Sequence, residues 1–387
     1  MKKTLNVGLV GYKFMGKAHS SGWSRVGMFF DPGCVIKKKV LCGRDPEWVR
    51  KSADSLGWEE TETDYKDLIR RDDIDIIDIA TPSNFHAEVA IAAAEAKKHV
   101  FCEKPLALSL ADARVMIAAV EANGVKNQVG FNYRFLPAIR LARKMIDSGR
   151  IGKIFHFRGV YLQDWIIDPS FPLVWRLDKD VAGSGSLGDL GAHVIDLARY
   201  LVDDIECVSG MSRTFVKERP IVEKMEGLQG VAQENAQMGK VNVDDATMFL
   251  CEFKNGALGT FEATRFAQGH KNNLTFEING EKGSIRFSLE RLNELEYLDA
   301  TQPPEIQGFS TIQATDGSHD YVNAWWPPGH VLGWDHTFVH EFYDLVCAIN
   351  EGKPTSPSFY DGMKCSQILE AVEKSCEERS WISVDSL

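Results

Sequence analysis

Residues 5–16 read Leu-Asn-Val-Gly-Leu-Val-Gly-Tyr-Lys-Phe-Met-Gly, and this stretch decides the fold of the first third of the chain. An apolar run passes into a glycine-containing turn and then into a segment with helical spacing of apolar residues. Gly11 and Gly16 stand at the first and third positions of a Gly-x-Gly-x-x-Gly dinucleotide fingerprint. Lys13 replaces the second glycine, which removes room for a close backbone approach but offers a positive charge to a phosphate. An ordinary tight turn is the alternative, and the strand–turn–helix context favours the dinucleotide site.

The segments around this turn alternate between strand and helix patterns. Strands are predicted at Leu5–Val10, Val35–Cys42, Ile74–Ala80, Lys98–Cys102 and Val125–Gly130, and helices at Met15–Val26, Pro46–Leu56, Asn84–Ala96 and Ser109–Asn123. Strict alternation indicates a parallel sheet with helices on both faces, because each parallel connection needs a crossover. The fold class predicted for residues 1–130 is therefore α/β, a dinucleotide-binding domain of the Rossmann type.

The pattern changes after residue 130. Helices are predicted at Ala138–Ser148, Ala192–Leu201, Thr337–Asn350 and Asp361–Glu373, and strands at Lys153–Leu162, Ile205–Phe215, Ala246–Phe253, Ala257–Phe266, Asn273–Asn279 and Ser284–Phe287. Turns at residues 254–256 and 279–283 join neighbouring strands as hairpins. Residues 131–387 are therefore predicted to form an α+β domain with a mostly antiparallel sheet. The polar stretch Lys217–Gly239 is expected to be a loop or an extension toward another subunit.

The composition excludes several classes of protein. Hydrophobic content of 44% and charged content of 26% are typical of a soluble globular protein, and 387 residues suffice for two domains. A net charge of −11 argues against nucleic acid or an anionic membrane as a partner, and no apolar run approaches the roughly 20 residues that span a bilayer. The eight cysteines are scattered, and the N-terminus lacks a signal-peptide cleavage pattern. We expect reduced thiols, no metal site and a cytoplasmic location.

Asp189 and His193 form the strongest chemical pattern in the second domain. They follow a glycine-rich stretch at residues 183–191, and residues four apart on a helix share a face. The helix N-terminus favours an ionised carboxylate, and an imidazole can accept a proton near neutral pH. The pair therefore fits a general base with an anionic neighbour. The alternative is structural, in which Asp189 caps the helix and His193 packs beside it.

The end of the second predicted strand, Gly43-Arg44-Asp45, concerns the adenosine side of the cofactor. A carboxylate at a strand end of this kind reads the ribose hydroxyls of NAD. Gly43 leaves that position empty, Arg44 could pair with a 2′-phosphate or stack on adenine, and Asp45 could take the ribose hydroxyls. A solvated loop is the alternative for both charges. The residues alone leave the choice between NAD and NADP open.

Two further motifs carry a resemblance to a known family. Ala80-Thr81-Pro82-Ser83-Asn84-Phe85-His86 follows the third predicted strand, and Cys102-Glu103-Lys104-Pro105-Leu106-Ala107 follows the fourth. Together with Asp189 and His193, they resemble the glucose–fructose oxidoreductase / inositol dehydrogenase / MocA family over nearly the whole chain. The chain is most similar to its levoglucosan-type sugar dehydrogenases, at residues 14–20, 131–134, 161–165 and 243–245. Lys13 and Gly43 depart from the family pattern and bear on cofactor preference.

The resemblance implies a role for each motif. In such enzymes the lysine and the Asp/His helix meet at the nicotinamide, so Lys104 would hydrogen-bond the reacting hydroxyl, Asp189 would position the sugar and His193 would take the proton. The residues expected at the cofactor are Gly11, Lys13, Phe14, Met15, Gly16, Gly43, Arg44, Asp45, Thr81, Pro82, Asn84, His86, Glu103, Lys104 and Asn132. Those expected at the substrate are Tyr133, Arg134, Asp164, Trp165, Trp175, Arg176 and His336.

The expected activity is NAD(P)-dependent oxidation of a secondary hydroxyl of a pyranose sugar, anhydrosugar or glycoside; carbon 3 is the first candidate, and the residues leave the choice of carbon open. NAD is the expected cofactor, with NADP tolerated. The alternatives are a cyclitol dehydrogenase, an NAD-dependent glycoside hydrolase or lyase that oxidises its substrate transiently, and a cofactor-sensing binding protein. We also expect a homo-oligomer, a tetramer, because the second domain's sheet would expose one face with Phe249, Phe253 and Phe261 among its apolar residues.

Overall fold

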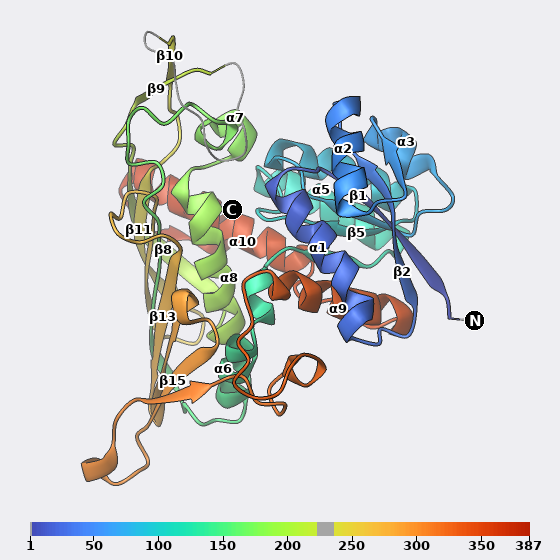
Figure 1. Ribbon diagram of the computed structural model, residues 1–387. Helices are drawn as coiled ribbons and strands as arrows, with labels where there is room; N and C mark the ends of the chain where they lie inside the picture. Colours follow the sequence, from blue (N-terminus) through green and yellow to red (C-terminus); the bar gives the residue numbers. More distant parts are fainter. Residues whose placement is uncertain (1, 223–235) are drawn as a thin grey trace. The chain divides into compact units, whose positions relative to one another are not determined.

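The structure, a computed structural model, describes residues 2–222 and 236–387 (Figure 1). The chain forms two compact units, each described separately below. The first comprises Met1–Phe135 and Gly333–Ser366, and the second comprises Leu136–Leu332 and Gln367–Leu387. The sequence analysis assigned everything after residue 130 to the second domain, whereas the segment Gly333–Ser366 packs within the first unit.

The first unit is built on a six-stranded parallel sheet with the strand order β3-β2-β1-β4-β5-β6. Its strands are β1 (Thr4–Val10), β2 (Val35–Cys42), β3 (Glu60–Glu62), β4 (Ile76–Ile79), β5 (His99–Cys102) and β6 (Asn127–Val129). Its helices are α1 (Phe14–Phe29), α2 (Pro46–Leu56), α3 (Tyr65–Arg70), α4 (His86–Glu95), α5 (Leu110–Asn123) and α9 (His336–Glu351). The predicted Rossmann-type unit is confirmed, and β3 and α3 are additions to it.

Local sequence explains why the predicted boundaries of β2 and α2 match the structure to the residue. Asp45 caps α2 by accepting hydrogen bonds from the backbone N–H groups of Glu47 and Trp48, and Pro46 occupies the first helical position. Gly57 ends the helix in the left-handed conformation. By contrast, β3 has only three residues, all half-buried, so it lacks the apolar pattern that would have predicted it.

The second unit contains a nine-stranded sheet with the order β16-β15-β14-β13-β7-β12-β11-β8-β17. Its strands are β7 (Ile154–Leu162), β8 (Ile205–Arg213), β11 (Ala246–Phe253), β12 (Leu258–Thr264), β13 (Asn273–Gly280), β14 (Gly283–Ser288), β15 (Glu294–Asp299), β16 (Ser310–Gln313) and β17 (Ile382–Ser383). Only β7 and β12 pair in parallel within this sheet, so the predicted mostly antiparallel sheet is confirmed. Both predicted hairpins are present, β11–β12 and β13–β14.

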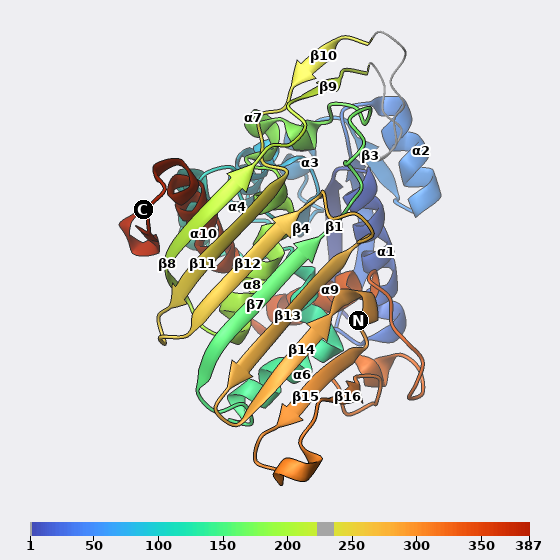
Figure 2. The ribbon, with the colours of Figure 1, turned by 90° about the vertical axis from the view of Figure 1, so that its left-hand side faces the viewer.

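Helices cover one face of this sheet. The second unit contributes α6 (Pro137–Asp147), α7 (Lys179–Ala182) and α8 (Ala192–Leu201), while α10 (Phe359–Glu378) begins in the first unit and ends in the second. Contacts join α8 to β7 and α6 to β14 and β15. Figure 2 looks onto the opposite face, which we call the open face, and shows the strands of the sheet side by side with no helix of the second unit in front of them.

The prediction that Phe249, Phe253 and Phe261 lie on a solvent-facing surface is wrong. All three are at least 95% buried on the helix-covered face, where Phe249 stacks on Phe261 with ring centroids 4.4 Å apart. Their strands alternate, so the neighbouring positions point to the open face instead. The apolar residues exposed there are Met211, Met248, Leu250 and Leu258. The sequence pattern identified the alternation but not which set of residues the helices cover.

The polar stretch Lys217–Gly239 is only partly described. At its two ends β9 (Glu218–Pro220) and β10 (Met238–Lys240) pair as a two-stranded antiparallel sheet. Arg219 of β9 is fully buried and donates hydrogen bonds to the carbonyl oxygens of Ile166 and Asp168. The predicted loop or extension between these strands falls on residues 223–235, which lie outside the described residues.

The core of the first unit contains a cluster of buried ionisable side chains. His19 of α1 lies between two carboxylates, with Nδ1 2.9 Å from Asp78 Oδ1 and Nε2 3.0 Å from Glu103 Oε1. Burial opposes the charged imidazole, but Asp78 and Glu103 outweigh it and raise the pKa of His19 to about 10. Glu341 of α9 is fully buried nearby, and neither carboxyl oxygen has a hydrogen-bond partner in the described part of the chain. Burial, reinforced by the charge of Glu103, raises the pKa of Glu341 well above its usual range.

We therefore predict that Glu341 makes the first unit less stable as the pH rises. Its pKa is higher in the folded than in the unfolded state, so its stabilising effect is complete below the unfolded value of 4.5 and is lost above it. The loss is up to about 1.4 kcal/mol per pH unit. His19 adds a second loss, between its unfolded value of 6.5 and about 10. Between pH 5 and 6.5 the Glu341→Gln variant should lose less stability than the wild type.

Urea unfolding at half-unit pH intervals measures this effect. Glu351→Gln, an exposed change in the same helix, is the matched control and should keep the wild-type slope. An identical slope in Glu341→Gln and wild type would show that Glu341 is not protonated in the folded state.

Candidate active site

The predicted nucleotide turn lies between β1 and α1. Gly11 has a φ of +113°, and a side chain there would place Cβ 2.5 Å from the carbonyl oxygen of Ala80. A Cβ at Gly16 would lie 2.1 Å from the carbonyl oxygen of Gly11. Both positions therefore need glycine for the turn to close on the start of the helix. Lys13 immediately precedes α1, and Phe14 and Met15 open it.

The residues at this turn fit a dinucleotide. The hydroxyl of Thr81, which follows β4 beside Gly11, is buried and has no hydrogen-bond partner within the described residues. An orphaned donor next to a glycine turn at the start of a long helix matches what a pyrophosphate and its ribose require. Pro82 and the exposed Asn84 continue the same loop. Exposed Phe14 stacks on Trp334, with ring centroids 5.8 Å apart.

The end of β2 shows why an acidic residue is missing there. A Cβ at Gly43 would lie 2.1 Å from a ring carbon of Tyr12, so Tyr12 occupies the space that a side chain at this position would need. The Arg44 guanidinium lies 5.5 Å from the centroid of the Phe85 ring. The Asp45 carboxylate caps α2, as described above. The strand end therefore presents a cation on an aromatic ring, and its nearest carboxylate is already bound to backbone N–H groups.

The Glu103-Lys104-Pro105 segment leaves the end of β5. The Glu103 carboxylate lies against His19 and accepts a hydrogen bond from the backbone N–H of Lys104, at 3.1 Å. His86 bridges this segment to the Thr81 loop, with ring nitrogens 2.9 Å from the Pro105 carbonyl oxygen and 3.0 Å from that of Thr81. Burial lowers the pKa of His86, and the neutral ring donates to one of these carbonyls. Glu103 and His86 thus fix the backbone around Lys104.

In the second unit, Asp189 lies in a π-helical turn, Leu187–Gly191, that runs directly into α8. The sequence predicted α8 at its observed bounds but not this turn. A π turn spaces its hydrogen bonds one residue wider than an α-helix, and such turns are frequent at functional sites. His193 stands in the first turn of α8 and is 7% exposed, with its ring centroid 6.0 Å from that of Tyr161. Asp189 is half-buried.

Asp244 anchors this turn to the sheet. Its carboxylate accepts hydrogen bonds from the backbone N–H groups of Gly185, at 2.7 Å, and Leu187, at 2.9 Å. The hydroxyls of Ser186 and Thr247 donate to the same carboxylate. The sequence analysis quoted this aspartate only as part of a family-like motif. Its position next to β11 could not be related to Asp189 without the fold.

Arg265 binds Asp189 directly. Its Nη2 donates to Asp189 Oδ2 at 2.9 Å and to the carbonyl oxygen of Gly185 at 3.2 Å. The guanidinium is fully buried, and its carbon lies 5.6 Å from the centroid of the Trp165 ring. Sequence reasoning missed this residue, because a single arginine after a strand carries no pattern. The available signal was strand alternation, because Arg265 lies two residues after Ala263, which is on the helix-covered face of β12.

The predicted substrate residues fall into two groups. In the second unit, the carboxylate of Asp164 is bound to Lys271 Nζ at 2.8 Å and to the backbone N–H of Gly269 at 3.0 Å. Trp165 donates to Gln163 Oε1, and the Arg176 guanidinium lies 4.4 Å from the Trp175 ring centroid. Asp164 is thus engaged in holding its own loop. Trp165 remains beside Arg265.

The other predicted substrate residues belong to the first unit. Tyr133 and Arg134 are buried, and Arg134 Nη2 donates to Asp361 Oδ1 at 3.1 Å. Asn132, predicted at the cofactor, donates from Nδ2 to Thr337 Oγ1 at 2.9 Å. His336 begins α9, and its Nδ1 lies 3.0 Å from the backbone nitrogen of Gly333 and 3.3 Å from Asp335 Oδ1. Burial lowers the pKa of His336.

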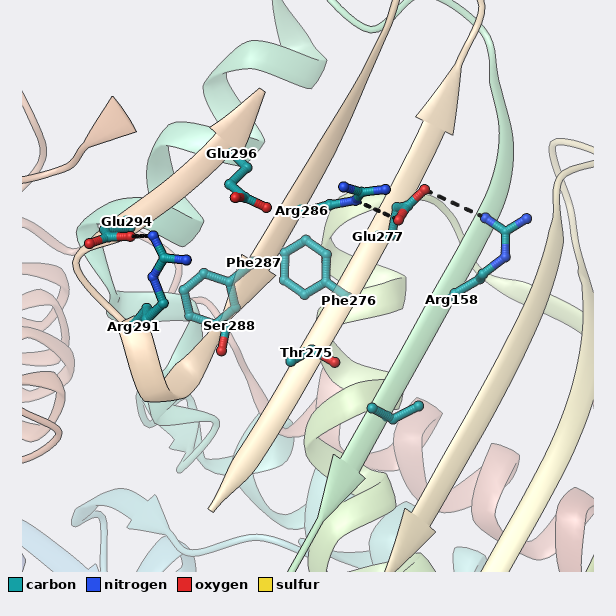
Figure 3. A pocket seen from close by; sticks show the side chains of 11 residues that line it. Arg158, Thr275, Phe276, Glu277, Arg286, Phe287, Ser288, Arg291, Glu294 and Glu296 are labelled. Carbon is teal, nitrogen blue, oxygen red and sulfur yellow. Dashed lines mark hydrogen bonds and ion pairs between the residues drawn. The ribbon is translucent and has the colours of Figure 1, made fainter. Parts of the chain in front are cut away.

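A hollow on the open face of the second unit contains none of the predicted site residues (Figure 3). Ion pairs line it, among them Arg286 Nε with Glu277 Oε2 at 2.7 Å and Arg158 with the same carboxylate at 3.9 Å. Its other charged residues are Arg291, Glu294 and Glu296. It lies on the face of the sheet opposite the one that packs against α8.

Two features that the described residues lack concern other classes of site. Residues 2–222 and 236–387 contain no group of three or more histidine, cysteine, aspartate or glutamate side chains arranged to hold a metal ion. None of their helices is long and apolar enough to cross a membrane.

Comparison with known proteins follows the same division of the chain. The family profile described as "Oxidoreductase family, NAD-binding Rossmann fold" matches residues 5–131, and the "GFO/IDH/MocA C-terminal domain" profile matches residues 139–286. Levoglucosan dehydrogenase of Pseudarthrobacter phenanthrenivorans is 43% identical over 388 residues, covering 100% of this chain and 99% of the relative.

Solved structures agree. The crystal structure of an oxidoreductase domain protein from Kribbella flavida has a TM-score of 0.93 at 52% identity, covering 99% of both chains. A levoglucosan dehydrogenase in complex with NADH and levoglucosan has a TM-score of 0.93 at 43% identity, covering 99% of this chain and 100% of that one. With a profile match to each part of the chain and a relative of this identity over its full length, the protein belongs to the GFO/IDH/MocA family of oxidoreductases with an NAD-binding Rossmann domain.

Proposed function

We propose that this protein oxidises a secondary hydroxyl, at carbon 3, of a pyranose sugar or anhydrosugar, and that levoglucosan is the first substrate to test. The observation that carries the proposal is the arrangement of Asp189 and His193 on one π turn and the helix after it, with Asp244 and Arg265 fixing the turn. The full-length relative named for levoglucosan supports the substrate class. A purely structural cap would not need an additional buried cation on Asp189.

Oxidation of an alcohol removes a hydride from carbon and a proton from oxygen. NAD, when bound, supplies the hydride acceptor. In the proposed mechanism His193 takes the hydroxyl proton as general base, and Asp189 accepts a hydrogen bond that orients the sugar. Lys104 donates to the same hydroxyl oxygen and stabilises the charge that develops there. Glu103 and His19 hold the Lys104 backbone in place.

A coupled measurement tests the activity. Purified enzyme is incubated with NAD and a panel of anhydrosugars, pyranoses, glycosides and cyclitols, and NADH formation is followed by absorbance. We expect accumulation of NADH with levoglucosan. Preference for cyclitols would favour an inositol dehydrogenase, and glycoside cleavage without net NADH would favour a hydrolase or lyase. Tight NAD binding with no turnover of any substrate would indicate a cofactor-sensing protein.

We predict that His193→Ala lowers kcat by about 10²-fold or more, the usual contribution of a general base, with a smaller change in KM for the sugar. His156→Ala, an exposed change on β7, is the control and should retain full activity. Steady-state kinetics with saturating NAD measure both variants. A kcat of His193→Ala close to that of the wild type would remove the general-base assignment.

A variant of Arg44 tests how the protein recognises the adenosine half of the cofactor. Because its guanidinium lies over the Phe85 ring, we expect it to extend a stacking surface for adenine rather than to pair with a 2′-phosphate. Arg44→Ala should then lower kcat/KM for NAD and NADP by similar factors and leave the preference for NAD unchanged. Arg50→Ala, on the exposed side of α2, is the control. A selective loss of NADP, worth about 1–3 kcal/mol for a charged hydrogen bond, would show that Arg44 reads the phosphate instead.

We also propose that the protein is a cytoplasmic homo-oligomer, a tetramer, that associates through the open face of the second unit. Met211 and Met248 are register partners on β8 and β11, and Leu250 and Leu258 extend the apolar surface across β11 and β12. Charged residues of both signs surround the nearby hollow, which suits contact with an identical surface (Figure 3). None of the eight cysteines, all of which lie in the described parts of the chain, forms a disulfide, which suits a reducing compartment.

We predict that Leu250→Glu weakens this association. Leu250 is 51% exposed, so a glutamate there is tolerated in the monomer but places a charge in the proposed interface. Sedimentation velocity at micromolar concentration should show the wild type as a tetramer and the variant as a smaller species. Met28→Glu, at a comparably exposed apolar position on α1, should sediment like the wild type. A monomeric wild type would contradict the proposed oligomer.

A further inference from the structure

Three polar residues continue the helix-covered face of the sheet beyond the ends of neighbouring strands in the second unit. Gln163 follows β7, Arg265 follows β12, and Asn272 precedes β13; we call these three residues the polar row. The strands lie in the order β13-β7-β12, and the backbone N–H of Gln163 still donates to the carbonyl of Thr264. Two residues further into each strand, the same face carries the buried residues Leu274, Tyr161 and Ala263, which are register partners. The face therefore changes from apolar to polar at one level across three strands.

Hydrogen bonds connect the members of this row to their neighbours. Asn272 Oδ1 accepts from the Tyr161 hydroxyl at 2.7 Å and from Gln163 Nε2 at 2.8 Å. Gln163 Oε1 in turn accepts from the indole N–H of Trp165 at 2.8 Å. The two side-chain amides are thus held in fixed orientations rather than rotating freely in solvent.

Both ends of this chain of contacts reach the proposed catalytic residues. The Tyr161 ring lies 6.0 Å from the ring of His193, centroid to centroid. The Trp165 ring lies 5.6 Å from the Arg265 guanidinium carbon, and Arg265 binds Asp189. Gln163 and Asn272 therefore occupy the part of the sheet between the two ends, on the same side as Asp189 and His193.

The two amides retain unused hydrogen-bonding capacity. Both lone pairs of Asn272 Oδ1 are occupied, and among residues 2–222 and 236–387 no group accepts a hydrogen bond from its Nδ2. Gln163 is half-buried and uses one N–H and one lone pair. A ligand that displaces water from these half-buried amides must replace its hydrogen bonds, and sugar hydroxyls can do so because they serve as both donors and acceptors. A neutral amide pair also favours an uncharged polyol over a phosphorylated one.

We propose that Gln163 and Asn272 are specificity-determining residues that bind a hydroxyl of the sugar other than the one oxidised. This inference rests on the proposed sugar dehydrogenase function and names the residues that select its substrate. Arg265, the third member of the row, acts differently, as a positioning residue for Asp189. Loss of Gln163 or Asn272 should therefore affect the recognition of one particular hydroxyl, whereas a structural role would affect every substrate alike.

A comparison of deoxy sugars tests the proposal. Wild type, Asn272→Leu and Gln163→Leu are assayed for kcat/KM on the preferred sugar and on each of its monodeoxy analogues. On the parent sugar we expect each variant to lose about tenfold or more, mainly through KM, because an uncompensated polar group is left in the site. On the one analogue that lacks the recognised hydroxyl, variant and wild type should agree within about twofold, as in a double-mutant cycle.

Asn273→Leu is the matched control. Asn273 is the next residue, and its side-chain amide donates to Glu290 Oε2 rather than joining the row. It should keep the wild-type profile. Asn272→Asp covers the case in which the leucine variants do not fold, because it keeps the acceptor for Tyr161 and Gln163 and replaces only the Nδ2 donor. It should show its smallest loss on the same analogue.

The outcomes separate the two hypotheses. If none of the sugars tested supports NAD reduction by the wild type, the proposed function is overturned and this inference with it. An active wild type whose variants lose the same factor on every analogue overturns the inference alone and assigns the amides a structural role.

Discussion

The carboxylate of Asp244 is the constraint on which the arrangement of the second unit's candidate site depends. It accepts hydrogen bonds from the backbone N–H groups of Gly185 and Leu187. Leu187 is the first residue of the π turn that contains Asp189. These donors belong to the start of a helix, where backbone N–H groups have no partner within the helix itself. A charged acceptor is about twice as strong as a neutral one in such a position. The turn is thereby attached to β11, and the orientation of Asp189 and His193 follows from that attachment.

The first unit uses buried charge for a similar purpose. His19 lies between Asp78 and Glu103, and the indole N–H of Trp23 donates to Asp78 at 2.7 Å. Glu103 is adjacent in sequence to Lys104 and binds its backbone N–H, so the buried carboxylate holds the chain directly after the end of β5. Burying these groups is costly unless each is paired. Glu341 meets the same requirement in another way, since burial favours its neutral form.

Much of the fold could be predicted because it depends on short-range signals. Gly11 and Gly16, the alternation of strand and helix patterns and the two hairpin turns are all local, and they located the Rossmann unit and the two hairpins. The face on which Phe249 lies depends on which side the helices cover, and that is a long-range property that alternation alone does not determine. The residues around Asp189 that were missed, Asp244 and Arg265, are separated from it by more than 50 residues in sequence. They become neighbours only through strand register.

Arg265 and Asp189 illustrate why such long-range partners matter for chemistry. The guanidinium is fully buried, and within the described residues its Nε and Nη1 have no hydrogen-bond partner. A buried pair with unsatisfied donors adds little to stability, and an apolar pair of the same size would often add more. Removing only one member would leave an uncompensated charge, so the two residues depend on each other. The benefit of the pair is therefore orientation, because Arg265 restricts the Asp189 carboxylate to one direction.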